Sequence, residues 1–253
     1  MNTIRLCGGL GNQLFQYAFG RMQRENGIDV YFDDSWYHKI YNAERLYLLD
    51  KFHTEVKFKK IMNARNIIRE QGFQKHFLKE DGYDFWGYWQ NPEYFEDIFP
   101  QLCKEFRVKE ELYTNEFLEL RKEISECNSV SIHVRRGDYL GNNGWRVIPI
   151  EYYNQALKIL RTLRDITNVY VFSDDVLWCT RHFKNAKFVH LVNYLDFELM
   201  KACSSNIIAN STFSWWAALL NENPKKTIIG PTVWNVKETR YPSFLAPKGW
   251  ILV

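Results

Sequence analysis

The stretch from Val130 to Tyr139, VSIHVRRGDY, constrains the fold more than any other part of the chain. Its first residues alternate between apolar and polar, as in a strand with one face in a core. The polar face carries Ser131, His133 and Arg135, and the glycine that follows starts a turn. The strand therefore delivers an imidazole and a guanidinium to its carboxyl end, where a planar fork donor suits a bidentate anion such as phosphate. The simpler alternative is a strand end with solvated arginines.

Strands and helices alternate along the chain, which predicts an α/β fold. The N-terminal part reads as a strand at 3–7, a turn at 8–13, a helix at 14–23 and a strand at 28–32. The C-terminal part reads as strands at 130–134, 169–172, 188–191, 206–209 and 227–229, with helices at 150–164, 197–203 and 215–220. Residues 35–128 carry charged helical segments and aromatic clusters without a clear order. We expect two domains, residues 1–128 and 129–253.

Polar residues follow several of the predicted strands. In a parallel sheet, ligands collect beyond the carboxyl ends of the strands, and these residues would meet there: His133, Arg135, Asp174, Asp175 and 210–214. Asn210, Ser211 and Thr212 precede a helix, where capping side chains, free N–H groups and the helix dipole favour an anion. This end suits a pyrophosphate with Arg135 opposite, although an ordinary helix cap is the alternative.

Asp174 and Asp175 are both eligible to recognise guanine. A carboxylate accepts the paired donors N1–H and the 2-amino group, which adenine lacks. The alternative for either residue is a solvated turn after a strand. The glycines at 8, 9 and 11 let the backbone approach a ligand closely, but their spacing is not that of a dinucleotide site.

The composition excludes several classes of protein. The chain has 253 residues with 33 basic and 30 acidic side chains, a net charge of +3, which is too balanced for nonspecific nucleic-acid binding. Five cysteines without a C-x-x-C pair indicate free thiols rather than a disulfide framework or a zinc site. No apolar run reaches the roughly 20 residues that a membrane helix needs, and no signal peptide is visible. We expect a cytoplasmic protein, at most peripheral on the inner membrane.

Three motifs together resemble those of the bacterial α-1,2-fucosyltransferase family. They are GGLGNQLFQYA from Gly8 to Ala18, HVRRGDY from His133 to Tyr139 and IANSTFSWW from Ile208 to Trp216. The segments GYWQ at 87–90 and DFELM at 196–200 are also similar to family segments. The matches are in order and span most of the chain.

The resemblance implies a GT-B glycosyltransferase with two Rossmann-like domains facing a cleft. Residues 1–128 would form the acceptor side and residues 129–253 the GDP-fucose side. The implied reaction is inverting transfer of fucose from GDP-β-L-fucose to the 2-hydroxyl of a terminal galactose, with no metal and no other cofactor. The acceptor would be a glycan, lipid-linked in O-antigen or capsule assembly. The chain is short for the family, so loops on the acceptor side are expected to be trimmed.

The resemblance also implies residue roles. His133 would contact the guanine side and Arg135 the β-phosphate, while Asp174 or Asp175 reads the base. The segment that would cradle the pyrophosphate comprises Asn210, Ser211, Thr212, Phe213 and Ser214. The loop expected near donor and acceptor holds Gly9, Gly11, Asn12 and Gln13. The aromatic cluster Trp86–Trp89 either lines the acceptor site or packs as a loop.

The bond that breaks defines the chemistry that is needed. Negative charge grows on the leaving diphosphate, which Arg135 and the helix N-terminus at Ser211 would stabilise. A carboxylate would take the proton of the attacking hydroxyl. Asp138 is the first candidate, although capping the turn and holding Arg136 is as good a role for it; Asp33 and Glu198 are the other candidates. The rival functions are another sugar nucleotide or linkage, and glycan binding without catalysis.

Overall fold

The computed structural model describes residues 1–39, 45–61, 66–141, 144–235 and 245–253. The chain divides into two compact units, Met1–Lys109 and Glu110–Val253. This division differs from the expected boundary at 128/129 by one helix, α3 (Asn115–Ser125), which packs on α6 (Asn193–Ala202) of the second unit. Glu123 of that helix also accepts hydrogen bonds from Tyr170 and Lys187, on strands of the second unit.

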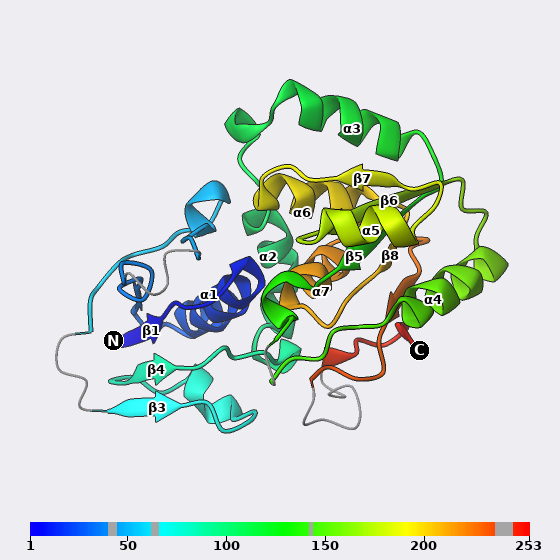
Figure 1. Cartoon of the computed structure of the whole chain (residues 1–253). Helices are drawn as coiled ribbons and strands as arrows, with labels where there is room; N and C mark the ends of the chain where they lie inside the picture. Colours follow the sequence, from blue (N-terminus) through cyan, green and yellow to red (C-terminus); the bar gives the residue numbers. More distant parts are fainter. Residues whose placement is uncertain (40–44, 62–65, 142–143, 236–244) are drawn as a thin grey trace. The chain divides into compact units, whose positions relative to one another are not determined.

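The first unit is built on a four-stranded parallel sheet of order β2-β1-β4-β3 (Figure 1). Its strands are β1 (Asn2–Arg5), β2 (Val30–Asp33), β3 (Ile67–Arg69) and β4 (Asp84–Trp86). Its α-helices are α1 (Leu10–Glu25) and α2 (Phe99–Glu105). Short 3-10 helices join them: Leu49–Lys51, Lys75–Leu78, Pro92–Tyr94 and Glu96–Ile98.

Helix α1 packs closely on one face of this sheet. A Cβ placed on Gly20 would lie 2.7 Å from a methyl group of Ile4 and 2.8 Å from the ring of Phe32, so a larger residue would force these side chains to shift. On the same side, Phe19 stacks on Trp89 and meets Phe85 edge-on. The segment after β4 is therefore largely core, with Trp89 fully buried.

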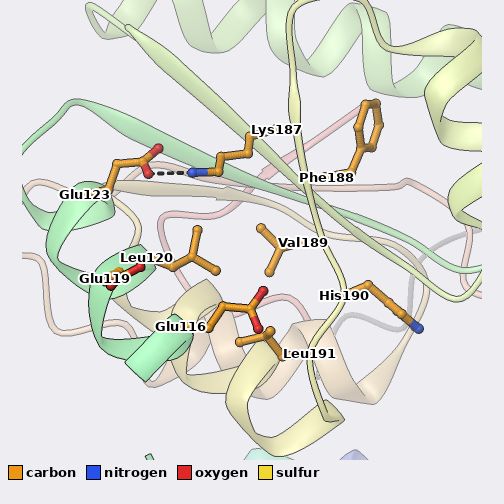
Figure 2. A pocket seen from close by; sticks show the side chains of 9 residues that line it. All are labelled: Glu116, Glu119, Leu120, Glu123, Lys187, Phe188, Val189, His190 and Leu191. Carbon is orange, nitrogen blue, oxygen red and sulfur yellow. Dashed lines mark hydrogen bonds and ion pairs between the residues drawn. The ribbon is translucent and has the colours of Figure 1, made fainter. Parts of the chain in front are cut away.

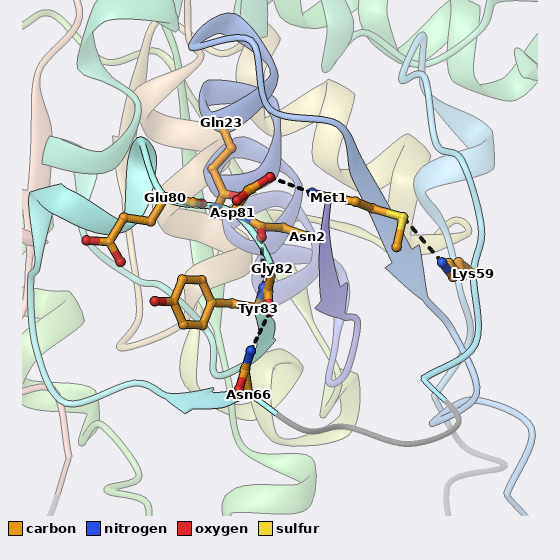
Figure 3. Close-up of polar contacts among 9 residues, drawn as sticks. All are labelled: Met1, Asn2, Gln23, Lys59, Asn66, Glu80, Asp81, Gly82 and Tyr83. Atoms are coloured by element: carbon orange, nitrogen blue, oxygen red, sulfur yellow. Dashed lines mark hydrogen bonds and ion pairs between the residues drawn. The ribbon is translucent and has the colours of Figure 1, made fainter.

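Side chains at the start of β1 fix its place in the sheet (Figure 3). The amide of Asn2 donates to Gln23 on α1 (2.7 Å) and to the Glu80 carbonyl (2.8 Å), and it accepts from the Tyr83 backbone N–H (3.0 Å). These bonds satisfy a buried amide and tie α1, β1 and the chain entering β4 together.

The second unit has a six-stranded parallel sheet of order β10-β9-β8-β5-β6-β7. The strands are β5 (Ser129–Val134), β6 (Asn168–Ser173), β7 (Lys187–Val189), β8 (Ser205–Ile207), β9 (Ile228–Gly230) and β10 (Ile251–Leu252). The further helices are α4 (Ile150–Leu163), α5 (Val176–His182) and α7 (Thr212–Leu219), with 3-10 turns at Glu110–Leu112 and Gly137–Tyr139.

Helices cover both faces of the second sheet. Val130, Ile132 and Val134 pack in one core cluster with residues of α4 and α5. On the other face, Asn206 donates to Ser131 Oγ (2.7 Å) and to the last turns of α6, and α6 packs on α7. The alternation in β5 is therefore confirmed, but both of its faces are buried.

The predicted α/β class is confirmed, because each of the two units is built on a parallel sheet with helices packed against it. One predicted boundary is wrong in a way that matters for function: α1 begins at Leu10, so Gly11, Asn12 and Gln13 lie in its first turn and not in a turn before it. The turn before α1 is made by Gly8, at φ +81°, and Gly9, and a Cβ on Gly8 would lie 2.5 Å from the amide of Asn12.

Candidate active site

Arg135 lies at the carboxyl end of β5, directly beside the end of β6. The register pairs Val134 with Ser173, so Arg135 and Asp174 leave neighbouring strands at the same level. One terminal nitrogen of Arg135 lies 2.9 Å from Asp174 Oδ2, and the other lies 2.5 Å from Asp138 Oδ1. The guanidinium thus bridges two carboxylates and is one-fifth exposed, at 21%.

Arg136 points to a different set of partners. Its Nε donates to Asp175 Oδ2 (3.1 Å), and its guanidinium lies 4.2 Å from the ring centre of Trp178. Asp175 also caps α5 by accepting from the Trp178 backbone N–H (3.0 Å). This backbone hydrogen bond, followed by the one from Arg136, lowers the pKa of Asp175. Asp175 is therefore held in a structural role as the N-cap of α5.

Both aspartates predicted to recognise guanine already accept hydrogen bonds from the protein itself. Asp174 accepts from the Arg136 backbone N–H (2.9 Å) as well as from Arg135. Gly137 makes this possible, since a Cβ there would lie 2.8 Å from Asp174 Oδ2. Two guanidinium groups thus meet three carboxylates, and this cluster holds one excess negative charge.

His133 is buried on β5 with 6% of its surface exposed. Burial, and secondly the positive charge of Arg135, lower its pKa to about 3, so the imidazole is neutral at pH 7. Its ring lies 5.4 Å from that of Phe213, and its Nδ1 has no hydrogen-bond partner within the described parts of the chain. A neutral imidazole beside an aromatic ring suits the polar edge of an uncharged ring better than it suits a phosphate.

The segment from Asn210 to Ser214 is only partly free for a ligand. Ser211 occupies the N-cap position of α7, but its side chain makes no capping hydrogen bond, so the predicted cap is wrong. Asn210 donates to the carbonyls of Arg146 and Trp234, and Ser214 donates to the Ser211 carbonyl. These two side chains hold the protein's own backbone. The groups of this segment that remain for a ligand include the first N–H groups of α7 and the Ser211 hydroxyl.

Tyr139 connects the arginine loop to α7, a link that the sequence does not indicate. Its hydroxyl donates to the Asn210 carbonyl (3.1 Å), and its ring lies 5.5 Å from the Arg135 guanidinium. The residue stands in the HVRRGDY motif, so its position in the motif was the available signal. It fixes the spacing between Arg135 and the start of α7.

The N-terminal glycine loop is held by its own side chains. Gln13 is fully buried; it donates to the Leu46 carbonyl (2.9 Å) and accepts from the Leu48 N–H (2.9 Å). Asn12 accepts from Gln90 (2.9 Å). Both amides therefore connect segments of the first unit, and the atoms of this loop that remain for a ligand are those of the backbone around Gly9 and Gly11.

The two alternative bases are engaged as well. Asp33 is 4% exposed and accepts from the backbone N–H groups of Ser35 and Ile61. Glu198 pairs with Lys201 at 2.8 Å, and both side chains are 10% exposed. Both carboxylates therefore already have partners within the protein.

Asp196 is a buried carboxylate that stands in the DFELM segment and for which no role is predicted. Burial raises its pKa to about 7, although a hydrogen bond from the Leu191 N–H lowers the pKa in part. The folded state therefore holds this proton longer than the unfolded state does, and the free energy of unfolding falls as pH rises from about 4 to about 7.

Asp196→Asn should remove this dependence. We expect the variant to exceed the wild type in unfolding free energy by about 2–4 kcal/mol at pH 8, and by much less at pH 4.5. Urea titrations at both values measure the difference. Asp165→Asn, at an exposed position, is the matched control; an equal effect of Asp196→Asn at both pH values would contradict a raised pKa.

A pocket of about 260 Å³ lies elsewhere in the second unit, between α3 and the edge strand β7 (Figure 2). Glu116, Glu119 and Glu123 line it against Lys187, which pairs with Glu123 at 2.5 Å. This lining carries an acidic excess and includes no residue of the arginine cluster. It does not suit a diphosphate.

Similarity to known proteins covers almost the whole chain and is not limited to the motifs of this site. Residues 1–251 match the family model described as glycosyl transferase family 11. The chain belongs to this family. One similar protein is O-antigen biosynthesis glycosyltransferase WbnK of Escherichia coli, which is 30% identical over 97% of this chain and 98% of the relative. Alpha-1,2-colitosyltransferase of Escherichia coli is 29% identical over 99% of this chain and 98% of the relative. Galactoside alpha-(1,2)-fucosyltransferase 2 of Rattus norvegicus is 29% identical over 87% of this chain and 67% of the relative.

As a member of family 11, the chain is a glycosyltransferase, which sets aside glycan binding without catalysis. Across the described ranges, no helix combines the length and apolarity needed to cross a membrane. Within those same ranges, no group of three or more His, Cys, Asp or Glu side chains is arranged to hold a metal ion.

Proposed function

We propose that this family 11 glycosyltransferase transfers fucose from GDP-β-L-fucose to the 2-hydroxyl of a terminal galactose, with inversion and without a metal. The names of its relatives support fucose or the related sugar colitose as the transferred group and an α-1,2 linkage. The name of the WbnK relative supports a role in O-antigen assembly.

The observation that carries the proposal is the position of Arg135. It lies at the carboxyl edge of a parallel sheet, and Tyr139 connects its loop to the start of α7. A fork donor on one side and helix N–H groups on the other offer two sets of fixed donors to a leaving diphosphate. Because such donors are oriented before the reaction, they stabilise developing charge without reorganisation.

Donor binding must change the ion pairs of the cluster. One excess carboxylate would repel a diphosphate, so Arg135 has to exchange at least one carboxylate for phosphate oxygens. Asp138 is the partner more easily released, since its side chain is 41% exposed against 24% for Asp174. Asp138 would then hold Arg135 in place in the free enzyme, and His133 would face the base as a neutral hydrogen-bonding group.

Asp138→Asn separates a positioning role from proton abstraction. The ion pair with Arg135 favours positioning, so we expect a change in the KM for the donor and a kcat within about tenfold of wild type. A general base would instead contribute about 10²–10⁴-fold to kcat. Steady-state kinetics with varied donor, together with calorimetric GDP binding, measure both; a loss in kcat beyond 100-fold with unchanged GDP affinity would make Asp138 the base.

The proposed activity is tested with a panel of donors in the presence of EDTA. Purified protein and a β-galactoside are incubated with GDP-fucose, GDP-mannose, UDP-galactose or a colitosyl nucleotide, and product is measured by mass spectrometry. We expect transfer from GDP-fucose. The colitosyl nucleotide is included because a relative that covers the whole chain is named for that sugar. Transfer only from the colitosyl nucleotide, or only after manganese is added, would overturn the proposal.

A further inference from the structure

Two arginines and a tryptophan end three neighbouring strands of the first unit. Arg5 is the last residue of β1, Trp86 of β4 and Arg69 of β3. The register pairs Arg69 directly with Trp86, and it pairs Ile4 with Phe85, so Arg5 is also level with Trp86. All three therefore lie at the carboxyl edge of the sheet, where open α/β sheets bind ligands.

Trp86 holds both guanidinium groups. The Cζ atom of Arg5 lies 4.3 Å from the centre of the Trp86 ring, and that of Arg69 lies 4.9 Å from it. Cation–π contacts of this kind orient a guanidinium but leave its N–H groups unused. Two like charges on one indole also repel each other, so the arrangement favours an anion close by.

These donors find no acceptor in the protein as described. Neither the Arg5 nor the Arg69 side chain forms an ion pair or a hydrogen bond with a residue in the described ranges, and the Arg5 Nε and the Trp86 indole nitrogen are buried without a partner there. The arginines of α1 differ: Arg21 pairs with Glu25 and Glu105, and Arg24 donates to two carbonyls. A buried donor without an acceptor is costly.

The nearest carboxylates along these strands are used elsewhere. Glu70 follows Arg69, but its two oxygens accept from the backbone N–H groups of Tyr88 and Gln90. Asp33 pairs with Arg5 in the sheet register, but it accepts from the backbone N–H groups of Ser35 and Ile61. Among the described residues, no carboxylate forms an ion pair with these two arginines, so their donors remain for an outside anion.

We propose that Arg5, Trp86 and Arg69 form an oxyanion-binding site that takes a phosphate or carboxylate group carried by the acceptor glycan. The fork geometry of guanidinium matches both groups. The assignment to the acceptor rests on the proposed function, whereas binding of the anion does not. The site would make this enzyme prefer charged acceptors, such as an acidic saccharide or a phosphate-linked glycan, over neutral ones.

The anion site is tested without any donor. The indole N–H signal of Trp86, assigned with Trp86→Phe, is followed by NMR while inorganic phosphate or glucuronate is added at constant ionic strength. We expect a saturable shift, with a dissociation constant raised about tenfold or more in Arg5→Gln or Arg69→Gln. Arg69 is exposed, so its variant keeps the test valid if Arg5→Gln does not fold.

Lys59→Gln is the matched control. Lys59 lies over Tyr31 on β2 at 5.5 Å and contacts Met1 (Figure 3). The substitution therefore removes a cation–π contact of the same unit at a position away from Trp86. Its titration should match the wild type. No shift with either anion, or an equal loss in Lys59→Gln, would overturn the site.

Acceptor kinetics test the second half of the proposal and separate the two sources of the anion. The same galactoside is compared with a neutral, a phosphorylated and a carboxylated aglycone. We expect a lower KM for at least one charged form, and Arg69→Gln should raise the KM of that form alone. Equal KM values for all three, with anion binding intact, would show that the oxyanion does not come from the acceptor. Anion binding by a protein that transfers no fucose would refute the proposed function while leaving the site.

Discussion

Arg135→Ala should lower kcat for fucosyl transfer by about 10²–10³-fold, the loss typical of removing one preorganised donor from a developing charge. The structure explains why the effect should be on the reaction rather than on folding. Arg135 is partly exposed and its two partners are both carboxylates, which water can solvate once the arginine is gone. GDP affinity should fall as well, because in the proposed mechanism Arg135 already contacts the diphosphate in the ground state.

The measurement is kcat and KM with varied GDP-fucose, together with the melting temperature. Arg161→Ala, on the exposed side of α4, removes the same side chain from the same unit and should leave kcat unchanged. Near-normal turnover by Arg135→Ala at an unchanged melting temperature would mean that the diphosphate binds elsewhere.

Phe19→Ala should lower the free energy of unfolding by about 3–5 kcal/mol, as large-to-small changes in a packed core do. Phe19 is fully buried at the centre of an aromatic cluster. Its ring stacks on Trp89 at 4.4 Å and meets Tyr94 at 5.0 Å and Phe85 at 5.1 Å. Alanine would leave a cavity that three large rings cannot close.

Urea unfolding followed by far-UV circular dichroism measures this loss. Phe58→Ala is the control in the same unit, since that ring is 50% exposed and its removal should cost well under about 1.5 kcal/mol. A cost below about 1 kcal/mol for Phe19→Ala would contradict the packing described for the first unit.

The second unit was the more predictable half of the molecule. Its strands are short apolar runs that end at Arg135, Asp174 and Asn210, and its helices carry a regular apolar face. Because each strand is followed by a helix, parallel pairing was the natural expectation, and the order of elements from β5 to β9 agrees with it. Boundaries differ by a few residues, as at α6, which begins at Asn193 and not at 197.

The fold of the first unit was harder to predict, because the described residues between β2 and α2 form only short elements. Between β2 and α2, short strands and 3-10 helices are connected by side-chain hydrogen bonds and aromatic packing. Such elements are too short to show the apolar–polar periodicity by which helices and strands are predicted from a sequence. The motif around Trp86 illustrates this: Trp89, with a left-handed φ of 57°, is core, whereas Trp86, three residues earlier, contacts two arginines.

The composition of the arginine cluster was predictable, but its pairing was not. Motifs indicated His133, Arg135 and the aspartates as neighbours. Which carboxylate each guanidinium contacts depends on strand register and on Gly137, which allows Asp174 to approach. The same holds for Asn210 and Ser214, because a sequence does not tell whether a polar side chain binds a ligand or a buried carbonyl of its own chain.

The most direct test of the central proposal is the NMR structure of the product formed from GDP-β-L-fucose and a β-galactoside in EDTA. We predict an α-linked fucose and a correlation between its anomeric proton and C2 of galactose. A β-linked fucose, attachment at another hydroxyl, or no product until a divalent ion is supplied would contradict an inverting, metal-free α-1,2 transfer.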